Sequence, residues 1–388
     1  MRYFRISVTL SKRRFLVLLI PYLTATSWYY LFFTQISSGE TSSANAYFNI
    51  SIALSLLANT FLVKKFSKLH LIYAWAITMP ILTVLSISVP NLLLSPVLIF
   101  LFGFLSGMSL LAYSVYFCNS TATEERGRVG GAIVFISLMI NPIVLLLLEN
   151  FMVGSVFLGA FTFIIHFLKP KKRATVKKIS SWRHENRAVL KYLIPWVVFC
   201  FVNGAFSRAI AANFTLQFGE FAFSVRIATY LTAAFGALIG GLLADWAGRR
   251  IALSVGLISF GVSATISGLI NAPVIFILFD SVQGFSWGIF LALYILVVWG
   301  DLAHTVNSVP FYAIGLFPLY FFTGLGYLIY PKLMIVPVGT LVLLSCLLIF
   351  LSNIFLIFSP ELMPKDKREE MILKRYGQRV KEFLKEHR

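Results

Sequence analysis

Twelve long apolar runs, separated by short polar or charged segments, constrain this chain more than any other feature of its sequence. Each run is long enough to cross the hydrocarbon core of a bilayer, which takes roughly 20 helical residues. The runs lack the alternation of polar and apolar residues that is typical of membrane β-barrels, so we predict an all-α membrane protein with twelve transmembrane helices. The predicted spans are 15–34, 45–63, 69–88, 93–117, 129–149, 151–168, 190–211, 220–243, 251–270, 272–299, 309–329 and 333–358.

Composition and charge agree with a membrane protein. The chain is 59% apolar and 12% charged, whereas soluble domains have about 25% charged residues. The net charge of +18 does not indicate a nucleic-acid partner, because the basic residues follow the topology of the spans. If both termini are cytoplasmic, all 33 Lys and Arg except Arg208, Arg226 and Lys332 fall in cytoplasmic segments. We therefore expect a multi-pass protein of the cell membrane whose partner is the lipid bilayer and whose termini are both cytoplasmic.

The spans divide into two similar halves. The basic segment 169–191 separates six spans from the next six, and short stretches of the first half recur in the second at a nearly constant offset. Residues 19–22 (LIPY) correspond to 193–196 (LIPW), and residues 101–103 (LFG) correspond to 278–280 (LFD). Parallel repeats of six helices are typical of transporters with a site between the halves. We predict a first half at 1–168, a linker at 169–191, a second half at 192–358 and a cytoplasmic amphipathic tail at 359–388.

A charged loop after the eighth span carries the clearest motif. Residues 241–250 read GLLADWAGRR, which resembles the G-x-L-A-D-x-x-G-R-R loop signature of the major facilitator superfamily. Gly241 allows two helices to approach closely, Asp245 can face a helix N-terminus, and Gly248 permits the turn before Arg249 and Arg250. The resemblance implies that this loop is a cytoplasmic latch between the halves, which holds the outward-open state.

A second loop, between the fourth and fifth predicted spans, is the expected partner of this latch. It reads EERGRVGG from Glu124 and resembles the E-R-G-R loop of the same superfamily. The relation between the halves places Asp245 and Arg249 near the start of the fifth span and near Glu125 or Arg128. The alternative is that all these charges are solvated. The first-half loop lacks the motif, because Thr60 and Lys64 stand at the Gly and Asp positions.

Ionisable residues inside predicted spans are candidates for function, because they are costly in a bilayer. Asp280 in the tenth span, Arg226 in the eighth and Arg208 in the seventh all lie in the outer third of the second half. We expect Asp280 to pair with Arg226 or Arg208. The pair would be structural, or would act in solute binding or proton coupling.

Aromatic and polar residues at helical spacing form stripes on the first, fourth, seventh and tenth spans, which line the central cavity in the superfamily that the chain resembles. Mixed rings and amides suit a neutral or weakly polar organic solute such as a sugar, although packing is the alternative interpretation of such stripes. The predicted substrate-binding residues are Tyr22, Tyr29, Tyr113, Trp196, Asn203, Asp280, Gln283 and Trp287.

No motif indicates an enzyme. The histidines and cysteines lack metal-site spacing, and there is no phosphate-binding loop, so we expect no cofactor, no metal and no ATP-driven transport. The leading hypothesis is a monomeric secondary or facilitative transporter of a small organic solute, with a proton as candidate coupling ion. Two alternatives stay open: an efflux antiporter for amphipathic compounds, and a transporter-like receptor or scaffold that no longer transports.

Overall fold

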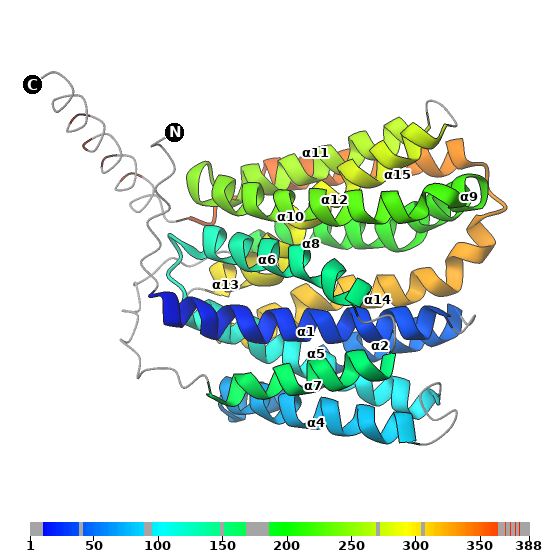
Figure 1. The fold of residues 1–388 in the computed structure, drawn as a ribbon. Coiled ribbons are helices and arrows are strands. Elements are labelled where there is room, and N and C mark those ends of the chain that lie inside the picture. Colours follow the sequence, from blue (N-terminus) through cyan, green and yellow to red (C-terminus); the bar gives the residue numbers. More distant parts are fainter. Residues whose placement is uncertain are drawn as a thin grey trace, which may run out of the picture.

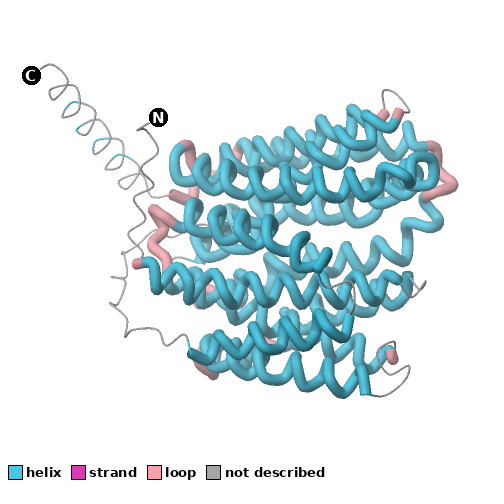
Figure 2. Tube along the Cα trace, in the orientation of Figure 1, coloured by secondary structure: helices cyan, strands magenta, loops and turns pink. Residues whose placement is uncertain are grey.

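The computed structural model describes residues 11–38, 42–88, 95–147, 151–167, 186–268, 272–303 and 307–363, together with residues 369, 373, 377 and 380. In this part of the chain the fold is helical and has no β-strand (Figure 1, Figure 2). The predicted all-α fold class is therefore confirmed. The helices lie roughly parallel or antiparallel to one another, as helices that cross one bilayer must.

The first six predicted spans each correspond to helix, with limits that differ by a few residues. The second predicted span, 45–63, divides at Asn59 into α2 and a short α3. The helices of this half are α1 (Lys12–Ser38), α2 (Ser42–Ala58), α3 (Thr60–Lys65), α4 (Lys68–Ser88), α5 (Pro96–Ser120), α6 (Arg126–Leu147) and α7 (Phe151–Phe167).

One span of the second half is longer than predicted. The seventh predicted span, 190–211, is too short, because helix continues from Asn186 to Phe218 through one π-helical turn. The elements are α8 (Asn186–Phe201), the π-turn η1 (Val202–Ser207), α9 (Arg208–Phe218), the 3₁₀ turn η2 (Gly219–Phe221), α10 (Ala222–Trp246), α11 (Arg249–Ser267), α12 (Pro273–Leu296), α13 (Val298–Ala303), α14 (Val309–Leu333) and α15 (Val338–Ile357).

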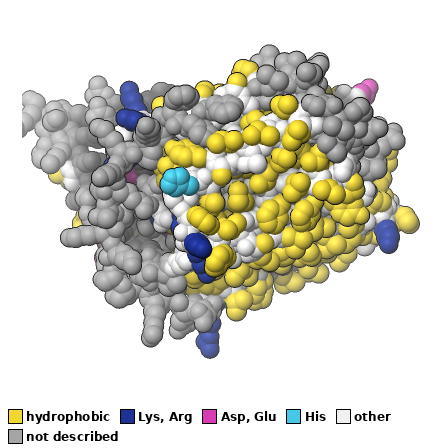
Figure 3. Space-filling model, turned by 90° about the horizontal axis from the view of Figure 1, so that it is seen from below, with side chains coloured by type: hydrophobic (Ala, Val, Ile, Leu, Met, Phe, Trp, Pro, Cys, Tyr) yellow, Lys and Arg dark blue, Asp and Glu magenta, His cyan; other side chains and the backbone are white. Residues whose placement is uncertain are grey.

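Eight stretches of the described chain are long and apolar enough to cross a membrane. One of them, Arg187–Trp246, holds two predicted spans, because the chain turns back at η2 (Figure 1). The predicted spans that are not among the eight correspond to α2, α6 and α7. Large apolar side chains remain exposed on the outside of the bundle, and Figure 3 shows them across one face. Such a face suits lipid as its solvent.

The two halves meet along two helix pairs. Helix α6 of the first half packs on α10 of the second, and α2 packs on α14. At the crossing of α6 and α10 the backbones are in contact. A Cβ atom added to Gly131 would lie 2.5 Å from the Ala237 carbonyl oxygen, and one added to Gly241 would overlap the Gly127 carbonyl oxygen. Gly241 thus stands where its predicted role in close helix approach requires it.

Two predicted segments fall mainly outside the described residues. Most of the predicted linker, 169–191, is among them, and α8 already begins at Asn186, inside its predicted limits. The predicted amphipathic tail is described only at 359–363 and at four single positions.

Candidate functional site

Asp245 joins the two halves at the end of the bundle where α6 and α11 begin, which we call the latch end. Its Oδ1 accepts a hydrogen bond from the backbone N–H of Gly127 at 3.0 Å, and its Oδ2 accepts one from the N–H of Arg128 at 2.8 Å. These N–H groups belong to the first turn of α6, where a helix leaves its donors unpaired and carries partial positive charge. Asp245 therefore caps a helix of the other half, and the predicted proximity is present.

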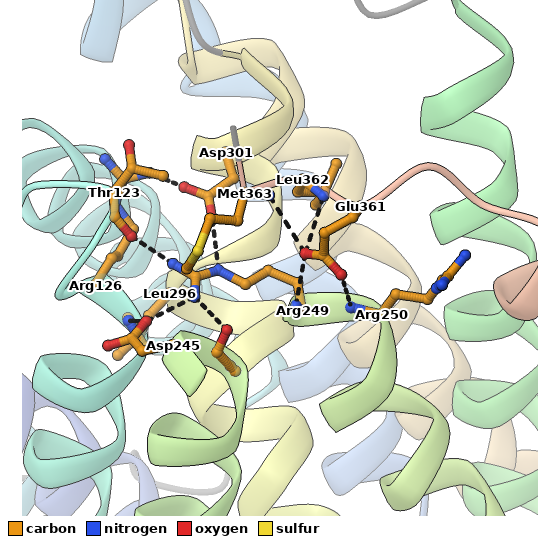
Figure 4. Close-up of polar contacts among 12 residues, drawn as sticks. Thr123, Arg126, Asp245, Arg249, Arg250, Leu296, Asp301, Glu361, Leu362 and Met363 are labelled. Carbon is orange, nitrogen blue, oxygen red and sulfur yellow. Dashed lines mark hydrogen bonds and ion pairs between the residues drawn. The ribbon is translucent and has the colours of Figure 1, made fainter. Parts of the chain in front are cut away.

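Arg249 is the centre of this arrangement and is fully buried, with 0% of its side chain exposed. Its guanidinium donates to Asp245 Oδ1 at 2.6 Å, to Asp301 Oδ2 at 3.0 Å and to the backbone oxygen of Ala244 at 2.6 Å. It also donates to the carbonyl oxygen of Thr123 in the loop before α6 (Figure 4). Arg249 thus links both carboxylates of the second half to the backbone of the first.

Asp301 on α13 completes the arrangement, and the sequence analysis did not single it out. It is fully buried and forms an ion pair with Arg126, the first residue of α6, in addition to its bond with Arg249. Arg126 also donates to Thr121 Oγ1 at 3.2 Å and to the Cys118 carbonyl oxygen at 3.0 Å. The four side chains Arg126, Asp245, Arg249 and Asp301, hereafter the latch network, alternate in charge and cross the boundary between the halves (Figure 4).

The other predicted latch residues lie around this network. Arg128 contributes its backbone N–H to Asp245, while its side chain pairs with Glu125 on the same turn at 3.9 Å. Gly248 has φ 114°, which favours glycine, and an added Cβ there would overlap the Glu361 carboxylate. The backbone N–H groups of Arg249 and Arg250 donate to Glu361 at 2.7 Å and 3.2 Å. The chain after α15 therefore docks on the start of α11.

Deeper in the bundle, α8 and α9 run antiparallel to α12 in a regular register. Trp196 stacks on Tyr294 with ring centroids 4.4 Å apart, and Trp287 Nε1 donates to Asn203 Oδ1 at 2.9 Å. Farther along, Phe214 stacks on Phe276 at 5.4 Å. The predicted residues Asn203 and Trp287 are thus brought together.

Three predicted substrate-binding residues are packed into the protein. Trp196 has 0% of its surface exposed and donates to the Gly315 carbonyl oxygen at 2.6 Å. Tyr113 donates to the Leu18 carbonyl oxygen at 2.9 Å, and its ring lies 5.3 Å from that of Tyr22. Since the indole N–H and the Tyr113 hydroxyl are satisfied by backbone, Trp196 and Tyr113 serve packing in this conformation.

Tyr29 lies where the halves face each other. Its hydroxyl donates to Asn49 Oδ1 at 3.2 Å, and its ring lies 6.1 Å from that of Tyr320 on α14. The neighbouring Tyr30 lies 5.6 Å from Tyr230 on α10. Aromatic rings from both halves therefore meet here.

The predicted ion pair of Asp280 is not formed. In the described residues no Arg or Lys lies within 4 Å of the Asp280 carboxylate. Arg208 instead lies over the ring of Tyr327 at 3.5 Å, and Arg226 is exposed. Similar predicted depth did not bring the charges together, because Arg208 packs on α14 and Arg226 is exposed.

Gln283 is buried, as only 8% of its surface is exposed, and its Nε2 has no hydrogen-bond partner in the described part of the structure. The Ser207 hydroxyl is in the same situation. Buried polar atoms without partners are rare in folded proteins.

Comparison with known proteins identifies the architecture. No protein-family model matches the sequence, and no curated protein matches it. Among solved structures, a variant of the E. coli fucose:proton symporter FucP matches with a TM-score of 0.66 and 13% identity, over 90% of this chain and 98% of the symporter. FucP in its outward conformation, described as a major facilitator superfamily transporter, matches with a TM-score of 0.66 and 12% identity over the same shares.

The chain has the major facilitator fold. This confirms the architecture of two six-helix halves that the repeats predicted.

Within the major facilitator fold, Asp301 and Arg126 are the residues that the sequence reasoning missed. The signals were present but weak. Asp301 is the acidic residue directly after the tenth span, and Arg126 is the first arginine of the loop whose other charges were singled out. Sequence spacing contains no information about which of these charges face each other.

Proposed function

We propose that this protein is a secondary transporter that moves a small organic solute across the cell membrane by alternating access. The observation that carries the proposal is the latch network. Its bonds join the two halves at the latch end of the bundle, and the residues that form them lie at helix ends and in loops. Rocking of one half against the other would break and remake these bonds. The excess of basic residues in the segments predicted at this end supports assigning it to the cytoplasm.

The energetics of the latch network suit a switch. Removing two charges from water costs about as much as their attraction returns, so a buried ion pair adds little net stability. When the halves separate, Arg126 and Asp301 regain water and lose each other. The joined and separated states are therefore close in free energy, and a bound solute can shift the balance.

A proton is the candidate coupling ion and Asp280 is its candidate site. The Asp280 carboxyl is half-buried in α12 and has no basic partner in the described residues. Such a group can gain and lose a proton without breaking an ion pair. The likeness to a structure described as a fucose:proton symporter supports a sugar-like solute with proton coupling.

Uptake into proteoliposomes tests the proposal. We expect purified protein to accumulate radiolabelled sugars or sugar acids, more strongly with an inward proton gradient. Asp280→Asn, which cannot release a proton, should abolish the response to the gradient and leave solute exchange without a gradient. Equal response of wild type and variant would remove Asp280 from coupling. Absence of any accumulation would contradict transport and favour a receptor or scaffold. Increased drug resistance on expression would instead favour efflux.

A further inference from the structure

The register of α8–α9 against α12 places Ser207 and Gln283 at the same level of the bundle. Asn203 bonds to Trp287 one turn toward the latch end, and Phe214 stacks on Phe276 two turns in the other direction. Because the helices are antiparallel, an increase of three or four in residue number along one helix corresponds to an equal decrease along the other. Ser207 and Gln283 therefore lie at the level between these two contacts.

This level contains polar atoms that the protein itself does not satisfy. Ser207 is 3% exposed and Gln283 is 8% exposed, and both Ser207 Oγ and Gln283 Nε2 lack a hydrogen-bond partner among the described residues. The levels on either side are satisfied or apolar: Trp287 donates to Asn203, and Phe214 meets Phe276. Two unpaired polar groups at one level are candidates for bonds to a ligand.

Arg208, the next residue, adds a positive charge at the same level. Its Nε donates to the Gly204 carbonyl oxygen at 3.3 Å, and its guanidinium carbon lies 3.5 Å from the centre of the Tyr327 ring. The π-turn η1 ends directly before it, and such turns are frequent at functional sites. The Tyr327 side chain and the Gly204 oxygen thus position the guanidinium, whose remaining N–H donors can bind a planar anion.

The described residues contain no acidic group that neutralises Arg208. No carboxylate lies within 4 Å of it, and Asp280 is not its partner. Arg208 packs on Tyr327 of α14, the helix whose Tyr320 meets Tyr29 of the first half, so the charge lies near the boundary between the halves. An arginine inside the bilayer without a counter-charge is costly, and bidentate binding of a carboxylate is what its geometry offers.

We propose that the transported solute is an organic acid, whose carboxylate binds the Arg208 guanidinium while its hydroxyl groups bind Gln283 Nε2 and Ser207 Oγ. The inference rests on the proposed transport function and specifies its substrate class. A sugar acid combines both chemistries, because it carries one carboxylate and several hydroxyls. A neutral sugar lacks the carboxylate, so its binding would leave the Arg208 guanidinium without a counter-charge.

The test compares acids with uncharged partners of nearly the same shape. Proteoliposomes containing the full chain are incubated with one equimolar pair at a time: D-glucuronate with D-glucose, D-galacturonate with D-galactose, or D-gluconate with D-sorbitol. The internal contents are then measured by mass spectrometry, with protein-free liposomes as blank. We expect at least one acid to accumulate and its neutral partner to stay at the blank level.

Two variants assign the selectivity to the site. Arg208→Gln should lower accumulation of the acid by about tenfold or more, because a charge-assisted pair is lost, and Arg208→Lys should retain part of it. Lys332→Gln removes an exposed positive charge from the end of α14 and serves as the matched control with unchanged uptake. Arg208→Gln loses no ion pair among the described residues, but it loses the bond to the Gly204 oxygen and the contact with the Tyr327 ring. Uptake is therefore compared at a temperature well below the melting temperature of each variant, which separates a binding defect from misfolding.

The outcomes are distinguishable. Accumulation of neutral solutes, unaffected by Arg208→Gln, would overturn the inference and keep the transport function. Accumulation of an acid that Arg208→Gln leaves unchanged would also overturn it, since the anion would then bind elsewhere. If no solute enters above the blank, transport itself fails and the inference fails with it.

Discussion

Asp301 is the residue on which the latch network depends most, because it is bonded to two buried arginines. Each arginine has further partners: Arg126 donates to Thr121 and to a backbone oxygen, and Arg249 donates to Asp245. Among the described residues, the Asp301 carboxylate is the one that pairs with an arginine side chain of each half. Loss of this one group therefore leaves two guanidinium groups without a common counter-charge.

We expect Asp301→Asn to lower the free energy of unfolding by about 3 kcal/mol, the cost of leaving buried charge unpaired. Chemical denaturation in detergent measures it. The control is Lys64→Gln, which removes an exposed charge from α3 and should change stability by less than about 0.5 kcal/mol. Equal stability of the two variants would mean that water already reaches the latch network.

At the scale of elements, the close crossing of α6 and α10 sets the distance between the halves. It depends on glycine, because an added Cβ on Gly241 would overlap the Gly127 backbone oxygen. The sequence motif predicted this close approach at Gly241. The relation between the halves also predicted the partner, because it placed this loop near the start of the fifth span, which is α6.

Gly241→Ala should therefore lower the free energy of unfolding by about 1–3 kcal/mol through overpacking. Gly339→Ala in α15 is the matched control: it has no atom within 4 Å of the new methyl group and should be neutral or stabilising by about 0.4–1 kcal/mol. Thermal unfolding of both variants in the same detergent makes the comparison. A loss of similar size at Gly339 would show that the effect is not due to the crossing.

The positions of the helices could be predicted from the sequence more fully than the contacts between them. Long apolar runs predicted every span, because lipid demands continuous hydrophobicity. The seventh span was predicted to end at 211, since Asn213, Thr215 and Gln217 lower the apolarity of the turns that follow. The pairing of Asp280 with Arg226 or Arg208 was predicted wrongly, because the sequence indicates how deep in the membrane a residue lies but not the direction in which its side chain points. Arg208 turns to Tyr327 on α14, a contact that no local pattern indicates.

At the scale of the whole molecule, two six-helix halves meet at a charged latch end and at aromatic contacts such as Tyr29 with Tyr320. Repeats in the sequence predicted the halves, and the comparison with solved structures confirms the fold. The proposed solute site lies at one level of η1, α9 and α12. Transport follows only if the latch end opens.

The accessibility of the Cys118 thiol measures such an opening directly. It lies at the end of α5, 9% exposed, and a Cβ added to Gly300 of the second half would lie 2.6 Å from its Sγ. The second half therefore covers this thiol for as long as the latch network is intact. Cys200 and Cys346 can be replaced by alanine, so that Cys118 is the one thiol of the chain.

The deciding measurement is the rate at which N-ethylmaleimide labels Cys118 in this background, with and without Asp301→Asn. Alternating access with a latch at this end predicts slow labelling when the network is intact and labelling about tenfold faster in the variant, where the open state gains population. Lys64→Gln should label at the slow rate. Equal, slow labelling in Asp301→Asn, in protein that remains folded, would show that the halves do not separate here and would contradict the account.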